Sequence, residues 1–358
     1  MLKQLGNTVM RYSPPTPERS ITLVVRALVL LLSPICIAVA IFWKQLNSPL
    51  QVPEVMIVEV APGSSLSGIS DRLALEGLLE NPLAFILWAR LTGKAQSLQA
   101  GDYELTPATT PRQLLQKISA GEVKQYQLTL IEGWTFQEAL EEIWRHKNIT
   151  PTLEGQSNEY IATQLGLQHK NPEGLIFPDT YFYERGVSDL EILQRAASRL
   201  QSILMDSWNK RIGALPFDGP YDALILASIV EKETAVATER IRVAGVFIRR
   251  LEQGMRLQSD PTVIYGMGAS FDGNIDRNAL NEVTPYNTYR VSGLPPTPIA
   301  LVGAGSIHAS MNPELTDYLY FVSRGDGSHH FSATLEEHNE AVRRYQLDKE
   351  PSQSINVR

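Results

Sequence analysis

The stretch YDALILASIVEKET, residues 221–234, ends a strongly apolar run with two carboxyl groups. In an α-helix, Ala227 and Ser228 lie on the same face as Glu231. A carboxyl group beside small and apolar neighbours has its charged form disfavoured, so its pKa rises and it can hold a proton near neutral pH. Glu231 is therefore a candidate acid that gives a proton to a leaving group and then acts as a base.

The second carboxyl group, Glu233, lies two positions further and must point to another side of such a helix. Glu231 and Glu233 therefore cannot act as a facing pair. Glycosidases generally use two carboxylates. A lytic cleavage needs only one, because the C6 hydroxyl of the sugar can attack its own anomeric carbon while a single carboxyl group serves first as acid and then as base. The pattern alone equally fits a helix whose last turn is simply solvated.

Composition limits the class of protein. The 358 residues are 43% hydrophobic and 20% charged, which suits two globular domains and an anchor. The net charge of −7 and the lack of a long basic run argue against a nucleic-acid partner. The single cysteine, Cys36, lies in the apolar N-terminal stretch, so the rest of the chain has no disulfide and no thiolate ligand.

Histidines near the C-terminus are the nearest approach to a metal site. His329, His330 and His338 flank Glu336 and Glu337, but this spacing matches no metal motif. A surface loop that runs into a helix explains them better. We therefore expect neither a metal nor another cofactor.

One segment predicts a membrane helix. Residues 27–43, ALVLLLSPICIAVAIFW, carry no charge, and their length of about 17 residues is near the lower limit for a bilayer span. Lys3, Arg11, Arg19 and Arg26 precede this segment. By the positive-inside bias, we expect a cytoplasmic N-terminus and an outward-facing remainder, as in a single-pass protein of a bacterial inner membrane. A cleavable signal peptide ending near Ala38-Val-Ala40 is the alternative.

The order of elements predicts an α+β protein with two outer domains. The expected segments are a cytoplasmic arm (1–26), a transmembrane helix (27–43), a linker (44–54), a small domain (55–124), a larger helix-rich catalytic domain (125–346) and a tail (347–358). Segments 55–60, 65–76, 81–91 and 103–105 predict a βααβ core in the small domain. This order, with VAPGSSLSGISDRL at 60–73, resembles the LysM-type carbohydrate-binding modules, although a structural spacer would look much the same.

Other local signals mark elements of both domains. Thr110-Pro111 predicts a helix start, and capping boxes at 135–138 and 188–191 predict two more. The segments 172–183, 293–298 and 325–330 predict loops, of which the first could be a strand edge and the last a hairpin. Thr297-Pro298 predicts the entry to a helix from Ile299 to Met311, in which His308 fits a structural role.

Six motifs carry a specific resemblance. They are ILASIVEKET (225–234), RLQSDPTVIYGMG (256–268), NTYRVSGLPPTPIALVGAGSIHASMNP (287–313), LYFVSRGDGSHHFSATLEEHN (319–339), EGLIFPDTY (173–181) and IEGWT (131–135). Together they resemble the endolytic murein transglycosylase family, the MltG/YceG-like proteins. The resemblance implies a lyase that cuts within nascent glycan strands, leaves 1,6-anhydro-N-acetylmuramic acid ends and terminates glycan elongation. It also implies that the first glutamate of the VEKE motif, Glu231, is the catalyst.

Flanking polar residues of these motifs are candidate substrate contacts: Gln258, Asp260, Tyr265, Asn287 and Tyr289. Each could instead be structural, for example Asp260 as a helix cap. The family implies peptidoglycan glycan strands as substrate and peptidoglycan synthases as partners. Two alternatives stay open: a non-catalytic envelope scaffold, and a hydrolase that uses Glu231 with Asp260 or Glu233.

Overall fold

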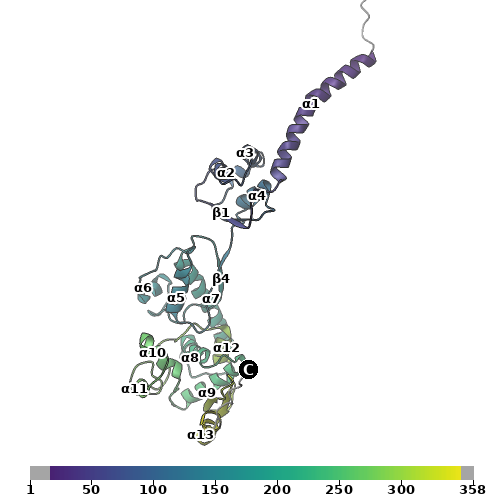
Figure 1. The fold of residues 1–358 in the computed structure, drawn as a ribbon. Helices are drawn as coiled ribbons and strands as arrows, with labels where there is room; N and C mark the ends of the chain where they lie inside the picture. Colours follow the sequence, from purple (N-terminus) through teal and green to yellow (C-terminus); the bar gives the residue numbers. More distant parts are fainter. Residues whose placement is uncertain (1–16, 348–358) are drawn as a thin grey trace, which may run out of the picture. The chain divides into compact units, whose positions relative to one another are not determined.

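The chain divides into two compact units, Met1–Lys124 and Gln125–Arg358. The computed structural model describes residues 17–347, and the side chains of residue 22 and of residues 24–347 (Figure 1). The expected cytoplasmic arm and C-terminal tail therefore lie largely outside the described residues. The elements of the first unit are α1 (Pro17–Asn47), β1 (Met56–Val60), α2 (Leu66–Leu75), α3 (Pro82–Leu91), a 3₁₀ turn (Lys94–Gln96), β2 (Gly101–Leu105) and α4 (Pro111–Ala120).

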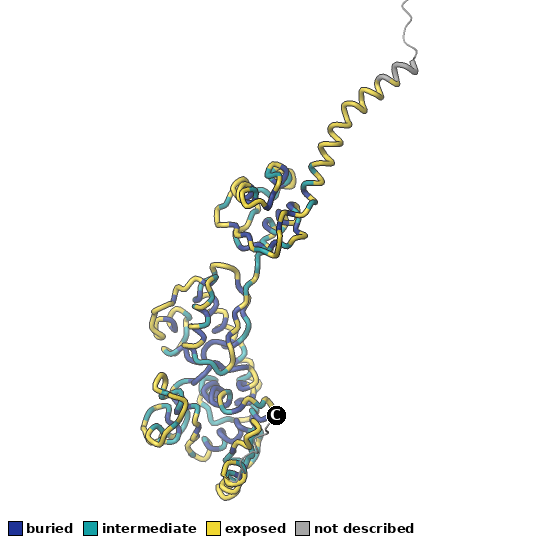
Figure 2. The backbone as a smooth tube through the Cα atoms, in the orientation of Figure 1, coloured by how far each residue is buried: buried dark blue, intermediate teal, exposed yellow. Residues whose placement is uncertain are grey.

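The helix α1 contains the predicted membrane segment and extends beyond it. Val24–Asn47 is a 24-residue stretch with a mean hydropathy of 2.6, long and apolar enough to cross a membrane. Its side chains are exposed over most of its length (Figure 2). The chain thus has an exposed apolar helix where the sequence predicts one, and this helix is compatible with a single-pass anchor.

The small domain has the strand–helix–helix–strand order that the sequence predicts. β1 pairs antiparallel with β2, with Val58 opposite Tyr103. Thr110 caps α4 through a complete capping box, as its position before Pro111 predicts. Residues 44–54 were expected to be a linker, but α1 continues to Asn47, and Leu50 and Val52 belong to the core of this domain. These two apolar side chains are buried in this core, whereas most polar side chains of the segment stay exposed.

The second unit is helix-rich with two short two-stranded sheets, which supports the α+β class. Its elements are β3 (Tyr126–Thr129), α5 (Phe136–Arg145), α6 (Asn158–Gln164), β4 (Thr180–Tyr183), α7 (Asp189–Asn209), α8 (Pro220–Glu233), a 3₁₀ turn (Ala237–Glu239), α9 (Arg240–Glu252), α10 (Asp260–Met267), a second 3₁₀ turn (Gly268–Ser270), α11 (Arg277–Asn281), α12 (Ala304–Met311), β5 (Tyr320–Ser323), β6 (His329–Ser332), α13 (Leu335–Val342) and a π-helical turn (Arg343–Leu347). β3 pairs with β4, and β5 with β6, both antiparallel.

The helix α8 is the central element of this unit. All eight residues from Ala223 to Val230 are buried, and α8 contacts α7, α9 and α12. Such a helix is apolar on every side, so its pattern does not tell which side faces a cavity. Its C-terminal end carries Glu231 and Glu233, and the helix stops there because Thr234 takes an extended conformation.

Two predicted loop segments contain the strand edge and the hairpin that the sequence allowed, whereas one predicted helix starts later than expected. Part of the turn-rich segment 172–183 forms β4, and residues 325–328 are the turn between β5 and β6. The helix expected from Ile299 begins only at Ala304, with Gly303 as its N-cap. Residues 299–302 are buried and not helical: the backbone N–H of Ile299 binds Ser228 Oγ, and that of Leu301 binds the carbonyl of Trp134.

Candidate active site

The last turn of α8 sends its two carboxyl groups to different surroundings. Residues two apart on an α-helix are separated by about 200° around the axis. Glu231 therefore turns toward the start of α9 and α12, whereas Glu233 turns toward the start of α10. The two carboxyl groups therefore contact different sets of residues.

Glu231 is held in a buried ion pair. Arg240 donates from Nη2 to Glu231 Oε1 at 3.0 Å, and the backbone N–H of Gly303 donates to Oε2 at 3.0 Å. The side chain of Glu231 is only 4% exposed, and that of Arg240 16%. A second carboxylate, Glu132, lies 3.6 Å from Arg240 Nη2. Both oxygens of Glu231 are thus engaged by groups of the chain itself.

Two glycines make room for this ion pair. A Cβ on Gly303 would collide with the carboxylate of Glu132, and one on Gly305 would collide with the guanidinium of Arg240. The Gly-Ala-Gly sequence at the start of α12 is therefore explained by close packing on the Glu231–Arg240 pair.

Glu233 faces an open cavity of about 470 Å³ in the second unit. Ser259 Oγ donates to Glu233 Oε1 at 2.5 Å, and Ser259 is itself buried. Burial, helped by the nearby negative charge of Asp260, raises the pKa of Glu233 to about 7 despite the lowering effects of the Ser259 hydrogen bond and of Arg250. The carboxyl group can therefore both hold and release a proton near neutral pH.

Three of the five predicted contact residues line this cavity. They are Gln258, Asp260 and Tyr289. Tyr289 donates from its hydroxyl to Asp260 Oδ1 at 2.6 Å. Burial is the main cause that raises the pKa of Tyr289, so this hydroxyl keeps its proton. The cavity thus presents a carboxylate, an amide and a phenol beside Glu233, which are groups suited to binding sugar hydroxyls.

Gln258 is held in an unusual backbone conformation. Its φ of 53° makes it the one non-glycine residue with positive φ in the part of the chain that the structure describes. This conformation costs an ordinary residue about 1–2 kcal/mol. Its N–H donates to the carbonyl of Thr288, and Arg250 reaches its side-chain oxygen at 3.5 Å. Strain of this kind concentrates at functional sites.

The other two predicted contact residues have structural surroundings. Asn287 is 1% exposed, and its side-chain nitrogen donates to the carbonyls of Ala279, Leu280 and Glu282. Tyr265 is not in the cavity lining, since it packs on Tyr286 and donates to Glu173 Oε2 at 3.1 Å. The structure therefore gives neither side chain a place in this cavity, although Asn287 helps to position Tyr289 by accepting its N–H.

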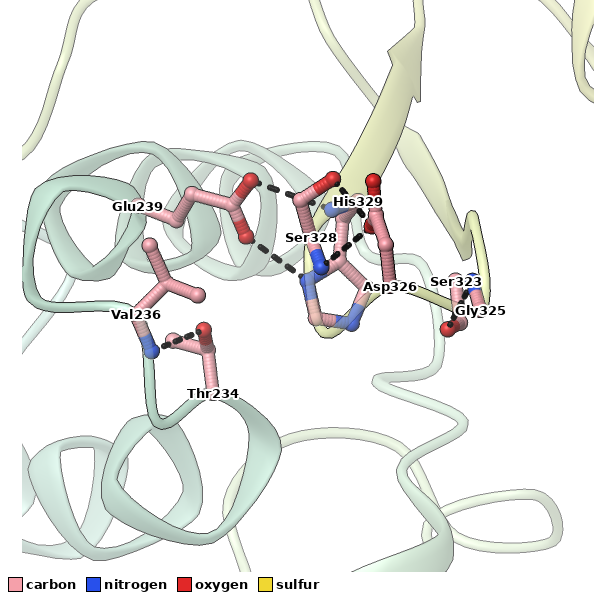
Figure 3. Close-up of polar contacts among 8 residues, drawn as sticks. All are labelled: Thr234, Val236, Glu239, Ser323, Gly325, Asp326, Ser328 and His329. Atoms are coloured by element: carbon pink, nitrogen blue, oxygen red, sulfur yellow. Dashed lines mark hydrogen bonds and ion pairs between the residues drawn. The ribbon is translucent and has the colours of Figure 1, made fainter. Parts of the chain in front are cut away.

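A carboxylate–histidine pair borders the same cavity, which the sequence did not predict. His329 Nδ1 lies 2.8 Å from Glu239 Oε2, and the backbone N–H of His329 donates to Oε1 at 3.0 Å (Figure 3). Figure 3 also shows the Asp326–Ser328 turn beside this pair. His329 lines the cavity, as does Arg250. The Gly325–His330 motif is thus a hairpin turn that also borders the cavity.

The histidines do not form a metal cluster. His329 pairs with Glu239, His338 stacks on Tyr320, and the ring of His330 lies near Tyr345. Within residues 17–347, no group of three or more His, Cys, Asp or Glu side chains could hold a metal ion.

The buried carboxyl group of Glu173 should make the stability of the protein depend on pH. Burial raises its pKa from 4.5 to about 7, although it accepts hydrogen bonds from Phe136 N–H and Tyr265. Between these pH values the folded state keeps a proton that the unfolded chain has released, so stability falls as pH rises through this window. We expect the free energy of unfolding to fall by up to about 3 kcal/mol per such group between pH 5 and 8.

Urea unfolding at several pH values measures this effect. Glu173→Gln should weaken the dependence of the free energy of unfolding on pH. The dependence that remains should come from Glu233, whose pKa burial also raises. The exposed Glu154→Gln should leave the pH dependence unchanged. A Glu173→Gln protein with the wild-type pH dependence would contradict the raised pKa.

Comparison with known proteins agrees with the motifs. The model of the YceG-like family matches residues 58–344. The endolytic murein transglycosylase of Bacillus subtilis is 30% identical over 308 residues, which are 80% of this chain and 84% of that protein. The protein of the same name from Streptococcus pneumoniae is 27% identical, over 80% of this chain and 57% of its own length.

A solved structure shows the same likeness. The crystal structure of a putative yceG-like protein from Listeria monocytogenes has a TM-score of 0.52 and 29% sequence identity, covering 81% of this chain and 99% of that one. The family match spans the small domain, α8 and the cavity-lining motifs. The family predicted from the six motifs is thereby confirmed, and this chain belongs to the YceG-like family.

Proposed function

We propose that this protein is a lytic transglycosylase, a lyase, that cleaves murein glycan strands with Glu233 as its acid and base. Membership of the family and the names of its relatives support the activity. One observation carries the choice of residue: Glu233 faces the cavity with a pKa of about 7, whereas both oxygens of Glu231 are bound within the chain.

The chemistry requires a single carboxyl group. Protonated Glu233 gives its proton to the glycosidic oxygen as the bond from that oxygen to the anomeric carbon of N-acetylmuramic acid breaks. The C6 hydroxyl of the same sugar then bonds to the anomeric carbon and returns its proton to the carboxylate. The products are a 1,6-anhydro end and a free hydroxyl, and no water is consumed. Burial supports this cycle because a pKa near 7 serves both transfers.

Asp260 has a different role in this proposal. Its carboxylate lines the cavity beside Glu233 and accepts the hydrogen bond of the Tyr289 hydroxyl. A fixed negative charge at this position stabilises the positive charge that develops at the anomeric carbon. In the hydrolase alternative, a second carboxylate such as Asp260 would instead activate a water molecule. This alternative predicts reducing ends rather than anhydro ends.

The proposal also includes the membrane location and the partners that the sequence predicts. The exposed apolar α1 supports a single-pass anchor in the inner membrane, with a cytoplasmic N-terminus and the residues after α1 outside. We further propose that the enzyme terminates elongation of nascent strands, that peptidoglycan synthases are its partners, and that the small domain acts as a LysM-like sugar-binding module.

Product analysis tests the proposed reaction. The full-length protein in detergent is incubated with unsubstituted glycan strands, and the products are analysed by mass spectrometry. We expect fragments with anhydro ends. Fragments heavier by one water would show a hydrolase, and intact strands would favour the non-catalytic scaffold.

The strained backbone of Gln258 yields a separate prediction. Glycine adopts a positive φ without a Cβ clash, so Gln258→Gly should keep the free energy of unfolding or raise it by up to about 1 kcal/mol. Turnover should fall because the cavity loses an amide beside Glu233. Urea unfolding and product formation on the same preparation check both parts. A clear loss of stability would mean that the side chain holds the loop through Arg250 instead.

A further inference from the structure

The helix α3 exposes a row of leucines. Leu83, Leu87 and Leu91 are 76%, 49% and 67% exposed. Their spacing of four residues puts them on one face of the helix. The outward face of a helix on a soluble domain normally carries polar side chains. A continuous apolar row on the surface therefore indicates contact with another apolar body.

The position of α3 is fixed by packing against the end of α1. The ring of Trp88 lies 5.7 Å from that of Trp43 and 6.4 Å from that of Phe42. Asn81, the N-cap of α3, donates to the side-chain oxygen of Gln45 at 3.0 Å. Both helices belong to the first unit, and Figure 1 shows α3 beside the lower end of α1.

The length of α1 determines where along the bilayer normal the contact between α1 and α3 lies. A hydrocarbon layer of about 30 Å takes about 20 helical residues. The uncharged run of residues 27–43 has about this length, so the span ends at Trp43, directly before Lys44. Trp43 and Trp88 share the guanidinium of Arg112, which lies 5.6 and 5.9 Å from their rings. Tryptophan with a cationic neighbour is typical of the boundary between lipid tails and headgroups.

We propose that α3 lies in the outer membrane–water interface and inserts Leu83, Leu87 and Leu91 among the lipid tails. The occupant of this face is thus the same bilayer that α1 crosses. The contact between Trp43 and Trp88 supports this proposal, because it holds α3 and its leucines at the level of the membrane where the α1 span ends. The small domain is then held against the bilayer by two helices, one crossing it and one lying on it. The inference rests on the proposed membrane anchor.

Spin labels on single cysteines of the full-length protein, reconstituted in vesicles of phosphatidylethanolamine and phosphatidylglycerol, test the inference. The native Cys36 reports on α1 itself. Leu83→Cys and Leu87→Cys, each with Cys36→Ser, report on α3. Leu315→Cys in the same background is the matched control, since Leu315 is 80% exposed in the second unit. Power saturation compares collisions with lipid-soluble oxygen and with a water-soluble nickel complex.

We expect the labels at Cys36, Leu83→Cys and Leu87→Cys to have an oxygen-to-nickel collision ratio several-fold above that of Leu315→Cys. If Cys36 is in lipid but both α3 labels match the control, the inference is wrong and the anchor stands. If both α3 labels are shielded from both reagents, a second protein surface covers the leucines and the inference is also wrong. A water-exposed label at Cys36 would refute the anchor itself.

Discussion

Replacing Glu233 by glutamine is expected to lower turnover on glycan strands by about 10²–10⁴-fold, the usual contribution of a positioned acid–base group. Glutamine has the shape of the protonated acid and can still accept the hydrogen bond from Ser259, but it cannot give or take a proton. Turnover is measured as anhydro-ended product per enzyme. Glu252→Gln, an exposed substitution on α9, is the matched control and should be as active as wild type.

The fold of the Glu233→Gln protein should be intact. The buried carboxyl group is costly when ionised, so its removal should not lower stability at pH 8, where wild-type Glu233 is mostly charged. Urea unfolding at that pH therefore separates a chemical effect from misfolding. A folded Glu233→Gln protein with wild-type turnover would contradict the role proposed for Glu233.

Replacing Glu231 by glutamine is expected to have the largest effect on stability. The substitution leaves the guanidinium of Arg240 buried without its main counter-charge, a change that costs roughly 3–5 kcal/mol at fully buried sites. Glu132 at 3.6 Å compensates in part, so we expect a loss of about 2–4 kcal/mol in the free energy of unfolding.

A double-mutant cycle with Arg240→Gln measures this pair. The double variant should be more stable than the sum of the two single losses implies, because it leaves no unpaired buried charge. A Glu231→Gln protein that keeps wild-type stability and loses all activity would instead support the sequence-based assignment of Glu231 as the catalyst.

Local elements of the fold were predictable because neighbouring residues determine them. Thr110 caps α4 and Thr135 forms its capping box as their sequences predict, while Ser188 caps α7 through its side chain alone, without the full predicted box. The long apolar run predicts α1 for the same reason. The start of α12 was not predictable, since the backbone N–H of Ile299 is bound by the hydroxyl of Ser228, 71 residues earlier in the chain.

The site was predictable only in part. Helix geometry already separates Glu231 from Glu233, but α8 is buried on all sides, so no amphipathic pattern tells which of them faces the cavity. The structural role of Asn287 depends on three carbonyls that α11 and the residue after it bring together. The partner of His329, Glu239, is 90 residues away in sequence. Such long-range pairs leave no local signal.

The most direct test compares folded Glu233→Gln and folded Glu231→Gln proteins on the same glycan strands, under conditions of pH and temperature where urea unfolding shows both to be native. The anhydro-ended product is quantified by mass spectrometry. If Glu233 is the acid and base, we expect product from the Glu231→Gln protein and at least about 100-fold less from the Glu233→Gln protein. Product from Glu233→Gln with none from Glu231→Gln would contradict this role of Glu233.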